Sequence, residues 1–369
     1  MKNIIVIGLM TGTSCDGMDL SLVNCTKSNE SIIGKTIKNH YIKYPISLTK
    51  KLLKLNTSNP AKIAKMHMEL GRFWSDKIHK WVKENNFKYD LIGIHGQTVF
   101  HDGGQSTLQI GEPLYISKNL NVPVIYNFRT KDIINKGQGA PLMPIVDKWL
   151  FANEPKDIIT LNIGGISNIT IIDKNKYILG FDTGPGMSLL DIYCLKYLNL
   201  PYDNNGSFSS KGKMDKTIVH KWIQEHNFIL SNPPKSTGKE LFGEQWLNNH
   251  FKSPKSTDHD DNLANLSYFT AKSIALNIHK FHKKNNGNQT PIYISGGGIK
   301  NKSITTNLNN LLHNYDICSV ADIGINPLFK ESFAFALLAA SNFFNIKINT
   351  NNITGADKPY IIGEISNWR

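Results

Sequence analysis

The sequence predicts a two-domain α/β protein. The chain has 369 residues, and a single hydrophobic core stops growing near about 250–300 residues. Apolar runs of strand length end in glycine-rich turns, and segments with helical spacing of apolar residues follow them. Each half also opens with a strand, a glycine turn and a second strand, at residues 4–23 and again at 157–172. This echo indicates two domains of one topology.

We expect an N-terminal domain over residues 1–135 and a C-terminal domain over 136–344, with residues 345–369 rejoining the first domain. The glycine-rich segment 137–141 is the expected crossover between them. In the first domain a long helix is expected from Pro60, because Asn59 suits its N-cap and apolar residues then recur at helical spacing. The expected strands are the short apolar runs at 4–9, 19–23 and 91–94.

In the second domain the expected strands are 157–163, 167–172, 177–181 and 292–295, and the expected helices are 188–198, 239–251, 263–283 and 327–344. Thr237 and Glu240 have the spacing of a capping box for the second of these helices.

The composition excludes several classes of protein. There is no run of about 18 apolar residues, so we expect no membrane span, and the short apolar run at the N-terminus does not resemble a signal peptide. The formal charge is +13, but the lysines are scattered and no basic run is interleaved with aromatic residues, so we expect no nucleic-acid partner. The four cysteines have no C-x-x-C spacing, so we expect neither a structural zinc site nor a disulfide framework. A cytoplasmic location is therefore the default expectation.

Four glycine-rich turns each follow an expected strand: Gly12–Gly17, Gly164-Gly165, Gly184–Gly186 and Gly296–Gly298. Glycine lets backbone N–H groups approach an oxyanion closely, and strand ends are where α/β sheets bind ligands. Together the turns predict a phosphate-binding site built from both domains. The chain has neither a complete P-loop motif nor a complete Rossmann fingerprint. Asp182-Thr183-Gly184 occurs once, whereas aspartic proteases need a pair of such carboxylates.

Nine motifs resemble those of the anhydro-N-acetylmuramic acid kinase family. They run in order along nearly the whole chain: GLMTGTSCDGMD at 8–19, HGQTVFH at 95–101, LQIGEP at 108–113, GQGAP at 137–141, NIGGISN at 162–168, GFDTGPG at 180–186, PPKSTG at 233–238, SGGG at 295–298 and TGA at 354–356.

This resemblance implies the sugar kinase/Hsp70/actin fold, which is ribonuclease H-like, with two α/β domains around a central ATP cleft. It implies that 1,6-anhydro-N-acetylmuramic acid, ATP and water give N-acetylmuramate 6-phosphate and ADP, in the recycling of cell-wall sugars. It also implies a homodimer.

The resemblance makes Asp182 the expected general base, which would take a proton from the water that attacks C1 of the sugar. From the residues alone, a capping role in its turn is equally compatible. The residues expected to bind ATP are Gly12, Thr13, Ser14, Cys15, Asp16, Gly17, Met18, Asp19, Gly164, Gly165, Gly184, Gly186, Gly296, Gly297 and Gly298.

Asp16 and Asp19 are also the expected Mg²⁺ ligands, since Mg²⁺ prefers oxygen ligands. Thr98, Arg129 and Glu331 are the expected sugar contacts, with Arg129 suited to bidentate pairing with the lactyl carboxylate. Glu331 has an alternative role, since an acid near a helix start interacts favourably with the helix dipole. His95 lies at the end of the expected strand 91–94, where a lone histidine more often has a structural role.

Two residues depart from the family pattern. Met187 stands where Asn is usual, and Asn127 where Asp is common. Two other functions remain open at this stage. An ordinary kinase of the same fold would need no water-activating base, and an ATP-gated interaction protein such as Hsp70 or actin would need no sugar site. ADP release with and without the anhydrosugar distinguishes all three.

Overall fold

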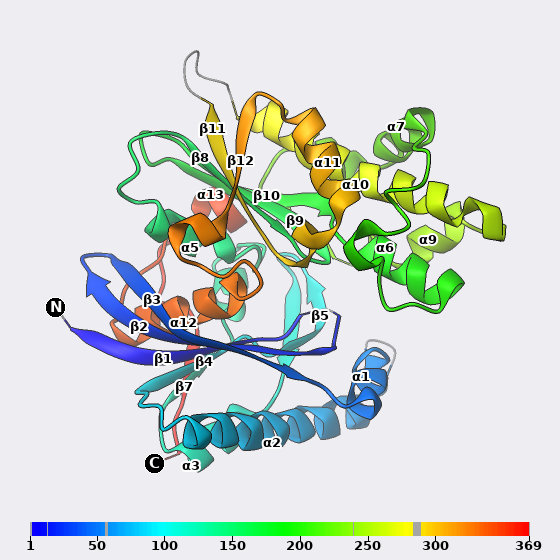
Figure 1. Cartoon of the computed structure of the whole chain (residues 1–369). Helices are drawn as coiled ribbons and strands as arrows, with labels where there is room; N and C mark the ends of the chain where they lie inside the picture. The colour runs from blue at the N-terminus through cyan, green and yellow to red at the C-terminus, as the bar shows by residue number, and fades with distance from the viewer. Residues whose placement is uncertain (1, 13, 56–57, 239, 283–288, 369) are drawn as a thin grey trace. The chain divides into compact units, whose positions relative to one another are not determined.

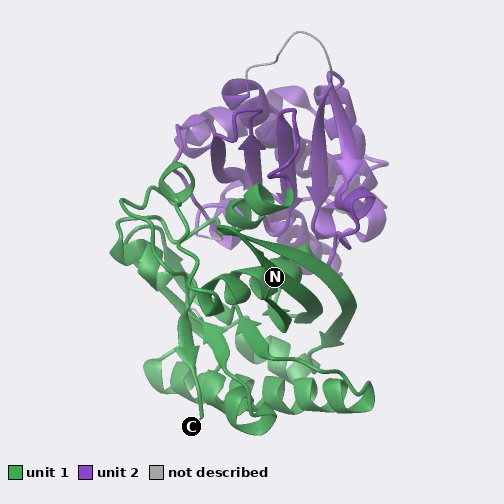
Figure 2. Cartoon of the chain, turned by 90° about the vertical axis from the view of Figure 1, so that its left-hand side faces the viewer, with its two compact units in different colours: residues 1–150, 329–369 green, residues 151–328 purple. Residues whose placement is uncertain are grey.

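The chain folds into two compact units, as seen in a computed structural model that describes residues 2–12, 14–55, 58–238, 240–282 and 289–368. Unit 1 comprises residues 1–150 and 329–369, and unit 2 comprises residues 151–328 (Figure 2). These boundaries differ from the expected domains, which changed at residues 135 and 344.

The boundaries differ because helices α5 (Met143–Leu150) and α12 (Lys330–Phe343) pack against each other in unit 1. A buried ion pair joins the two helices, with Lys330 Nζ 2.6 Å from Asp147 Oδ1. The expected crossover at 137–141 therefore lies inside unit 1, where the N–H of Gln138 also bonds to the carbonyl of Thr354.

Unit 1 is built on a six-stranded sheet in the order β13-β7-β4-β1-β2-β3. Strands β1, β2 and β3 form an antiparallel meander, β4 and β7 continue the sheet parallel to β1, and β13 closes it antiparallel to β7. The bounds are β1 Asn3–Met10, β2 Gly17–Ser28, β3 Ser31–Lys43, β4 Leu91–Ile94, β7 Val124–Tyr126 and β13 Glu364–Ser366. All three strands expected here are confirmed, and β3 extends the meander beyond them. A separate hairpin pairs β5 (Gln97–Asp102) with β6 (Ser106–Ile110).

Unit 2 repeats this strand order. Its five-stranded sheet runs β10-β9-β8-β11-β12, again an antiparallel meander of three strands extended by two parallel strands on the side of the first. The bounds are β8 Ile158–Ile163, β9 Ile166–Ile172, β10 Ile178–Pro185, β11 Thr290–Ser295 and β12 Tyr315–Ser319. The repeated topology confirms the predicted duplication and the two-domain α/β fold of sugar kinases, Hsp70 and actin.

The five expected helices occur in the expected order with shifted ends, as α2, α6 with its π-helical turn, α9, α10 and α12, and the other helices were not predicted (Figure 1). In unit 1 the remaining helices are α1 Ile46–Leu52, α2 Pro60–Glu84, α3 Pro113–Leu120, α4 Thr130–Ile134 and α13 Asn351–Thr354. Those of unit 2 are α6 Ser188–Tyr193, which continues as a π-helical turn over Cys194–Leu198, α7 Lys216–Glu225, α8 Asn227–Leu230, α9 Glu244–His250, α10 His259–Phe281 and α11 Lys302–Leu311. Asn59 caps α2 as predicted, with its side chain accepting the N–H of Lys62.

The predicted capping box at Thr237 and Glu240 is wrong. Their side chains do meet, with Thr237 Oγ1 3.4 Å from Glu240 Oε1, but helix α9 begins only at Glu244, after Gly243. The backbone N–H of Thr237 is used elsewhere, because it donates to the side chain of Asp182. Lys239, the predicted first residue of this helix, lies outside the described residues.

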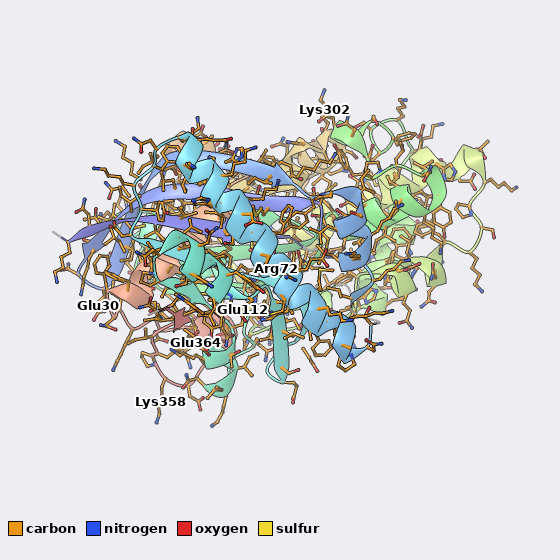
Figure 3. All side chains as sticks on the ribbon, turned by 90° about the horizontal axis from the view of Figure 1, so that it is seen from below. Glu30, Arg72, Glu112, Lys302, Lys358 and Glu364 are labelled. Atoms are coloured by element: carbon orange, nitrogen blue, oxygen red, sulfur yellow. The ribbon has the colours of Figure 1, made fainter. Side chains whose placement is uncertain are left out.

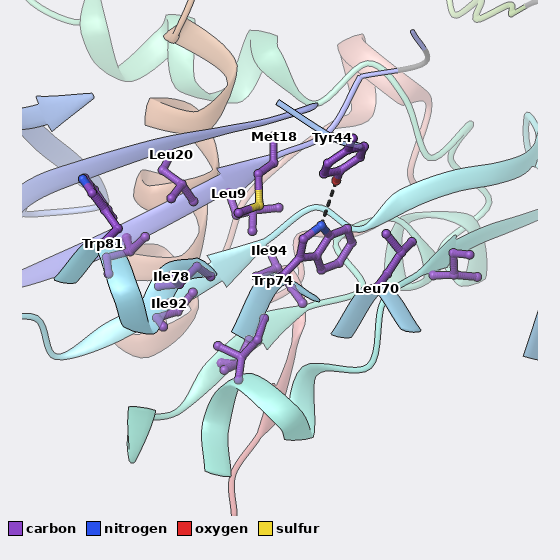
Figure 4. Packing of buried hydrophobic residues seen from close by; sticks show 14 of the residues in the cluster. Leu9, Met18, Leu20, Tyr44, Leu70, Trp74, Ile78, Trp81, Ile92 and Ile94 are labelled. Atoms are coloured by element: carbon purple, nitrogen blue, oxygen red, sulfur yellow. Dashed lines mark hydrogen bonds between the residues drawn. The ribbon is translucent and has the colours of Figure 1, made fainter. Parts of the chain in front are cut away.

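Two helices cover opposite faces of the sheet of unit 1. Helix α2 packs on the face that carries Ile7 and Leu9, and the indole of Trp74 donates to the hydroxyl of Tyr44 at 2.7 Å within this core (Figure 4). Helix α12 packs on the other face. There Gly8 permits direct contact, since a Cβ at this position would lie 2.0 Å from the carbonyl oxygen of Ser332. The first turn of α12 is thus held beside the end of β1.

No helix in the described part of the chain is both long and apolar enough to cross a membrane. Acidic and basic side chains are mixed on the surface of unit 1, where Figure 3 labels the exposed Glu30, Arg72 and Lys358.

Candidate active site

The first group of predicted site residues lies at one edge of the sheet of unit 1. Strands β1, β4 and β7 are parallel, so their carboxyl ends meet there. The loop after β1 is bound to the segment after β4 by two hydrogen bonds. Thr11 Oγ1 donates to the carbonyl of Gly96 at 2.9 Å, and Gln97 Nε2 donates to the carbonyl of Gly12 at 3.1 Å. The fold therefore fixes the start of the predicted phosphate loop.

The predicted phosphate loop divides into an open part and a buried part. Ser14 and Asp16 are exposed, and the hydroxyl of Ser14 donates to the Asp16 carboxylate. Cys15 is buried with a φ of 55°, and its N–H bonds to the carbonyl of Gly12. Thr13 lies outside the described residues.

Gly17, Met18 and Asp19 already belong to β2. The side chain of Met18 is buried in the core of unit 1, so it does not extend from the loop toward a ligand. A Cβ at Gly17 would lie 2.5 Å from the ring of Tyr41. The expected contribution of Gly17 and Met18 to nucleotide binding is thus restricted to the backbone.

The charges of two carboxylates act on a third carboxylate, Asp19, beside this loop. The pKa of Asp19 is raised to about 7, chiefly by burial, then by the negative charges of Glu331 and Asp16. Glu331 is brought close because it lies in the first turn of α12. Such a group is unfavourable without a cation, and a divalent cation would relieve the repulsion. Within the described ranges no three metal-ligating side chains converge on one point, but Mg²⁺ in kinases commonly takes one or two carboxylates, with phosphates and water as its other ligands. The residues present fit Mg²⁺.

Arg129 is fixed by a second network in unit 1. Its Nη2 lies 2.8 Å from Nε2 of His95, and its Nη1 donates to the carbonyl of Gly139 at 2.8 Å. Gly139 is held in turn by Asp132, whose Oδ2 accepts the Gly139 N–H at 2.7 Å. Asp132 is fully buried, and its Oδ1 also accepts the hydroxyls of three residues of the C-terminal segment: Thr350, Thr354 and Tyr360. Sequence reasoning missed Asp132, which lies outside the family motifs.

Thr98 and His95 both follow β4. Thr98 is half-buried in β5, where its hydroxyl accepts from Gln109 Nε2 at 3.4 Å. Burial and the charge of Arg129 hold the pKa of His95 well below its usual value. His95 is thus a neutral acceptor for Arg129, in agreement with the structural role expected for it.

The three glycine turns of unit 2 also meet at one sheet edge, because β8, β10 and β11 run in the same direction. The carbonyls of Gly164 and Gly165 accept the N–H groups of Gly186, Met187 and Ser188. A Cβ at Gly186 would lie 2.2 Å from the carbonyl oxygen of Gly164, and one at Gly298 would lie 2.2 Å from Ile163 Cγ2.

These contacts change the role expected of the turns. The N–H of Gly186 is committed to the neighbouring turn, so this glycine serves close packing between the turns. Gly184 has a φ of +138° and lies in β10, where the pairing with β9 is irregular. Gly296 is packed against the end of β8. Gly297 is exposed, and a Cβ there would meet no atom within 4 Å, which leaves room for a ligand to approach its backbone.

Asp182 lies near the end of β10 and is 6% exposed. Its Oδ2 accepts the N–H of Thr237 at 2.9 Å, and its own N–H donates to the carbonyl of Lys235 at 3.2 Å. Sequence reasoning did not give Lys235 a role, although the PPKSTG motif contains it.

Both departures from the family pattern have structural explanations. Asn127 has a φ of 50°, a conformation that Asn adopts readily. Its Nδ2 donates to Glu364 at 2.8 Å, which an aspartate could not do when ionised. Met187 is half-buried and packs against buried apolar residues of unit 2 in the described part of the chain, including those of α6 and of strands β8 and β9.

Comparisons with known proteins decide the family. The family model described as "Anhydro-N-acetylmuramic acid kinase" matches residues 4–367. The chain belongs to the anhydro-N-acetylmuramic acid kinase family. Two relatives with this name come from Bacillus cereus, at 36% identity, and Bacillus thuringiensis subsp. konkukian, at 35% identity, and each comparison covers 98% of both chains. This kinase is therefore a phosphotransferase that uses ATP.

Solved structures that resemble the kinase are distant in sequence. The activator of the 2-hydroxyisocaproyl-CoA dehydratase from Clostridium difficile has a TM-score of 0.42 at 12% identity, covering 93% of this chain and 96% of that one. A ROK family glucokinase from Streptomyces griseus has a TM-score of 0.39 at 12% identity, covering 91% and 99%.

Proposed function

We propose that this kinase opens 1,6-anhydro-N-acetylmuramic acid with water and phosphorylates the released O6, giving N-acetylmuramate 6-phosphate and ADP. The substrate has no free 6-hydroxyl, because O6 forms the bridge to C1. Opening the bridge and transferring the phosphoryl group must therefore be coupled, and a base for the attacking water is required.

The carboxylate of Asp182 is the observation that carries the proposal. The backbone N–H of Thr237 binds one of its oxygens and so orients the carboxylate, and an oriented carboxylate can act as a general base. Water attacks C1, Asp182 takes its proton, the C1–O6 bond breaks, and O6 takes the γ-phosphoryl group from ATP.

The loop from Gly12 to Asp19 is our candidate for holding the γ-phosphate. Asp16 and Asp19 would hold Mg²⁺, which neutralises charge on the phosphoryl group as it is transferred. In unit 2 the open backbone at Gly297 supports a nucleotide role for the 296–298 turn, while Gly164, Gly165, Gly184 and Gly186 shape the turns beside it.

Arg129 is the proposed ligand of the lactyl carboxylate. His95 and Gly139 orient its guanidinium, so the geometry of the fork is set before the sugar binds. Thr98 and Glu331 are the proposed sugar hydroxyl contacts. The proposal includes a cytoplasmic setting in cell-wall sugar recycling and a homodimeric state.

A coupled ADP assay tests the function. The purified protein is given ATP and Mg²⁺ with 1,6-anhydro-N-acetylmuramic acid, N-acetylglucosamine, glucose or no sugar. We expect ADP release only with the anhydrosugar. Release stimulated by glucose or N-acetylglucosamine, and not by the anhydrosugar, would replace the proposal with an ordinary sugar kinase.

A further inference from the structure

Hydrogen bonds in unit 2 link Asp182, Lys235, Asn277 and Thr183 into a closed ring. The N–H of Asp182 donates to the carbonyl of Lys235 at 3.2 Å, and the ammonium group of Lys235 donates to Asn277 Oδ1 at 2.9 Å. The Asn277 side chain closes the ring, because its Nδ2 donates to the carbonyl of Thr183 at 3.2 Å. Thr237, two residues beyond Lys235, binds the Asp182 carboxylate itself.

The burial of Lys235 is unusual for a lysine. The residue is 5% exposed, and its ammonium group donates to the carbonyls of Phe228 and Ile229 at 3.1 and 2.9 Å as well as to Asn277. These bonds match the three donors of an ammonium group. The rings of Phe181, Phe228 and Phe281 lie 5.2, 5.1 and 5.9 Å from Nζ. Lysine is rarely buried unless its charge has partners, so a role for this charge must be sought nearby.

We propose that Lys235 is a positioning residue for Asp182, which anchors the segment that binds the carboxylate and uses its buried charge to keep that carboxylate ionised. The inference rests on the proposed function in taking Asp182 as the base. The ammonium group of Lys235 donates to Phe228, Ile229 and Asn277, so in this proposal Lys235 acts through Asp182 and not on the substrate.

The electrostatics agree with this geometry. The pKa of Lys235 is lowered to about 8, chiefly by burial and then by the charge of Lys280, and the negative charge of Asp182 opposes this decrease. Lys235 is thus mostly charged at pH 7, and its attraction to Asp182 is mutual. Two further charged groups lie near the ring in the described part of unit 2. Lys280, at the end of α10, donates to the carbonyl of Leu230, and Glu240 accepts from the hydroxyl of Thr237.

Direct titration of Asp182 tests the proposal without sugar or nucleotide. The protein is labelled with ¹³C at aspartate Cγ, and the Asp182 signal is assigned as the one that Asp182→Asn removes. We expect Lys235→Met to raise the midpoint of its titration by about one pH unit, because an opposite charge is lost. Lys280→Met is the matched control, which removes a lysine charge outside the ring and should leave this midpoint unchanged. An unchanged midpoint in Lys235→Met would overturn the proposal.

The wild-type protein supplies a second reading that needs no Lys235 variant. The Asp182 signal should show a smaller inflection near pH 8, as Lys235 loses its proton, and Lys280→Met should move this inflection to higher pH. If Lys235→Met does not fold, the absence of this inflection overturns the proposal and its presence supports it. Failure of Asp182 as the base would be seen separately, as normal turnover in Asp182→Asn.

In the kinase assay, the acidic limb of the kcat/KM profile of Lys235→Met should move to higher pH by the same amount as the titration midpoint of Asp182. A purely structural role would lower kcat/KM at every pH without moving the limb.

Discussion

Arg129 donates a hydrogen bond from Nη2 to Nε2 of His95 across 2.8 Å. The bond requires an unprotonated Nε2, and His95 meets this requirement because burial and the charge of Arg129 keep its pKa well below the usual value. A buried neutral imidazole beside a guanidinium orients the cation without cancelling its charge. Arg129 therefore keeps its positive charge for an anionic ligand.

Arg129→Lys should raise KM for 1,6-anhydro-N-acetylmuramic acid by about 10-fold or more, with a smaller change in kcat. A lysine ammonium cannot bond to His95 and Gly139 and still present a planar fork to a carboxylate. Steady-state kinetics measure both constants. The control is the anhydrosugar without a lactyl group, 1,6-anhydro-N-acetylglucosamine, which should be used equally poorly by both proteins. A KM increase of the same size for this sugar would show that Arg129 does not bind the lactyl carboxylate.

Asp132→Asn should lower the free energy of unfolding by about 2–4 kcal/mol, because one carboxylate oxygen becomes an amide donor among buried donors. Asp132 accepts from three hydroxyls and from the N–H of Gly139. Urea unfolding followed by tryptophan fluorescence gives the difference. Thr350→Val removes one of these bonds and should cost about 1 kcal/mol. KM for the anhydrosugar should also rise in Asp132→Asn, because Asp132 holds Gly139, which orients Arg129. If the stability loss of Asp132→Asn is no larger than that of Thr350→Val, Asp132 does not have the central role in this network.

His101 should make the fold sensitive to acid. Burial, and secondarily the charge of Arg129, lowers its pKa to about 4, against an unfolded value near about 6.5. Below about pH 6.5 the unfolded chain binds a proton that the folded chain does not, so stability falls as the pH decreases toward about 4. Between about pH 7.5 and 5 this residue should account for a loss of about 1–2 kcal/mol. His101→Gln should reduce the decline in unfolding free energy by that amount, and identical pH slopes in both proteins would refute the assignment.

Asp182→Asn should reduce turnover by about 10²-fold or more while nucleotide affinity stays unchanged. The amide oxygen can still accept the N–H of Thr237, so the variant loses the base with little change in shape. Calorimetric titration with a non-hydrolysable ATP analogue measures affinity, and the ADP assay measures turnover. Near-normal turnover in the folded variant would leave Asp182 with only the capping role.

The topology could be predicted because it depends on local patterns. The strands that were predicted in the two meanders are apolar runs bounded by turn residues, and helix α2 begins at the Asn59-Pro60 pair that predicts it. The unit boundaries could not be predicted from the sequence, because they depend on tertiary contacts. The Lys330–Asp147 ion pair joins helices far apart in the sequence and draws residues 136–150 into unit 1.

The chemistry of the site could be predicted only in part. The family resemblance predicts Asp182 and Arg129 as site residues, but it does not predict the residues that hold them. Lys235 and Asp132 are ordinary charged residues in the sequence, and only the fold shows that each is buried among acceptors or donors supplied by distant segments. The glycine turns were correctly placed at strand ends, yet the sequence cannot show which N–H groups other turns already use. At Gly186 this makes the difference between a phosphate donor and a packing residue.

The last prediction concerns the oxygen atom of water. In the proposed reaction water attacks C1 and O6 remains with the sugar, so the oxygen of the phosphate ester is the original bridge oxygen. In water enriched with ¹⁸O, the product should carry the label at the C1 hydroxyl and none in the phosphate ester. Mass spectrometry of the product and of its phosphate after enzymatic release separates the two positions. The measurement must be made early, because ring opening at C1 exchanges the label with solvent, and a control with unlabelled product in labelled water gives the rate of that exchange. Label in the transferred phosphate would mean that ATP is hydrolysed before transfer, and Asp182 would then have no water at C1 to activate.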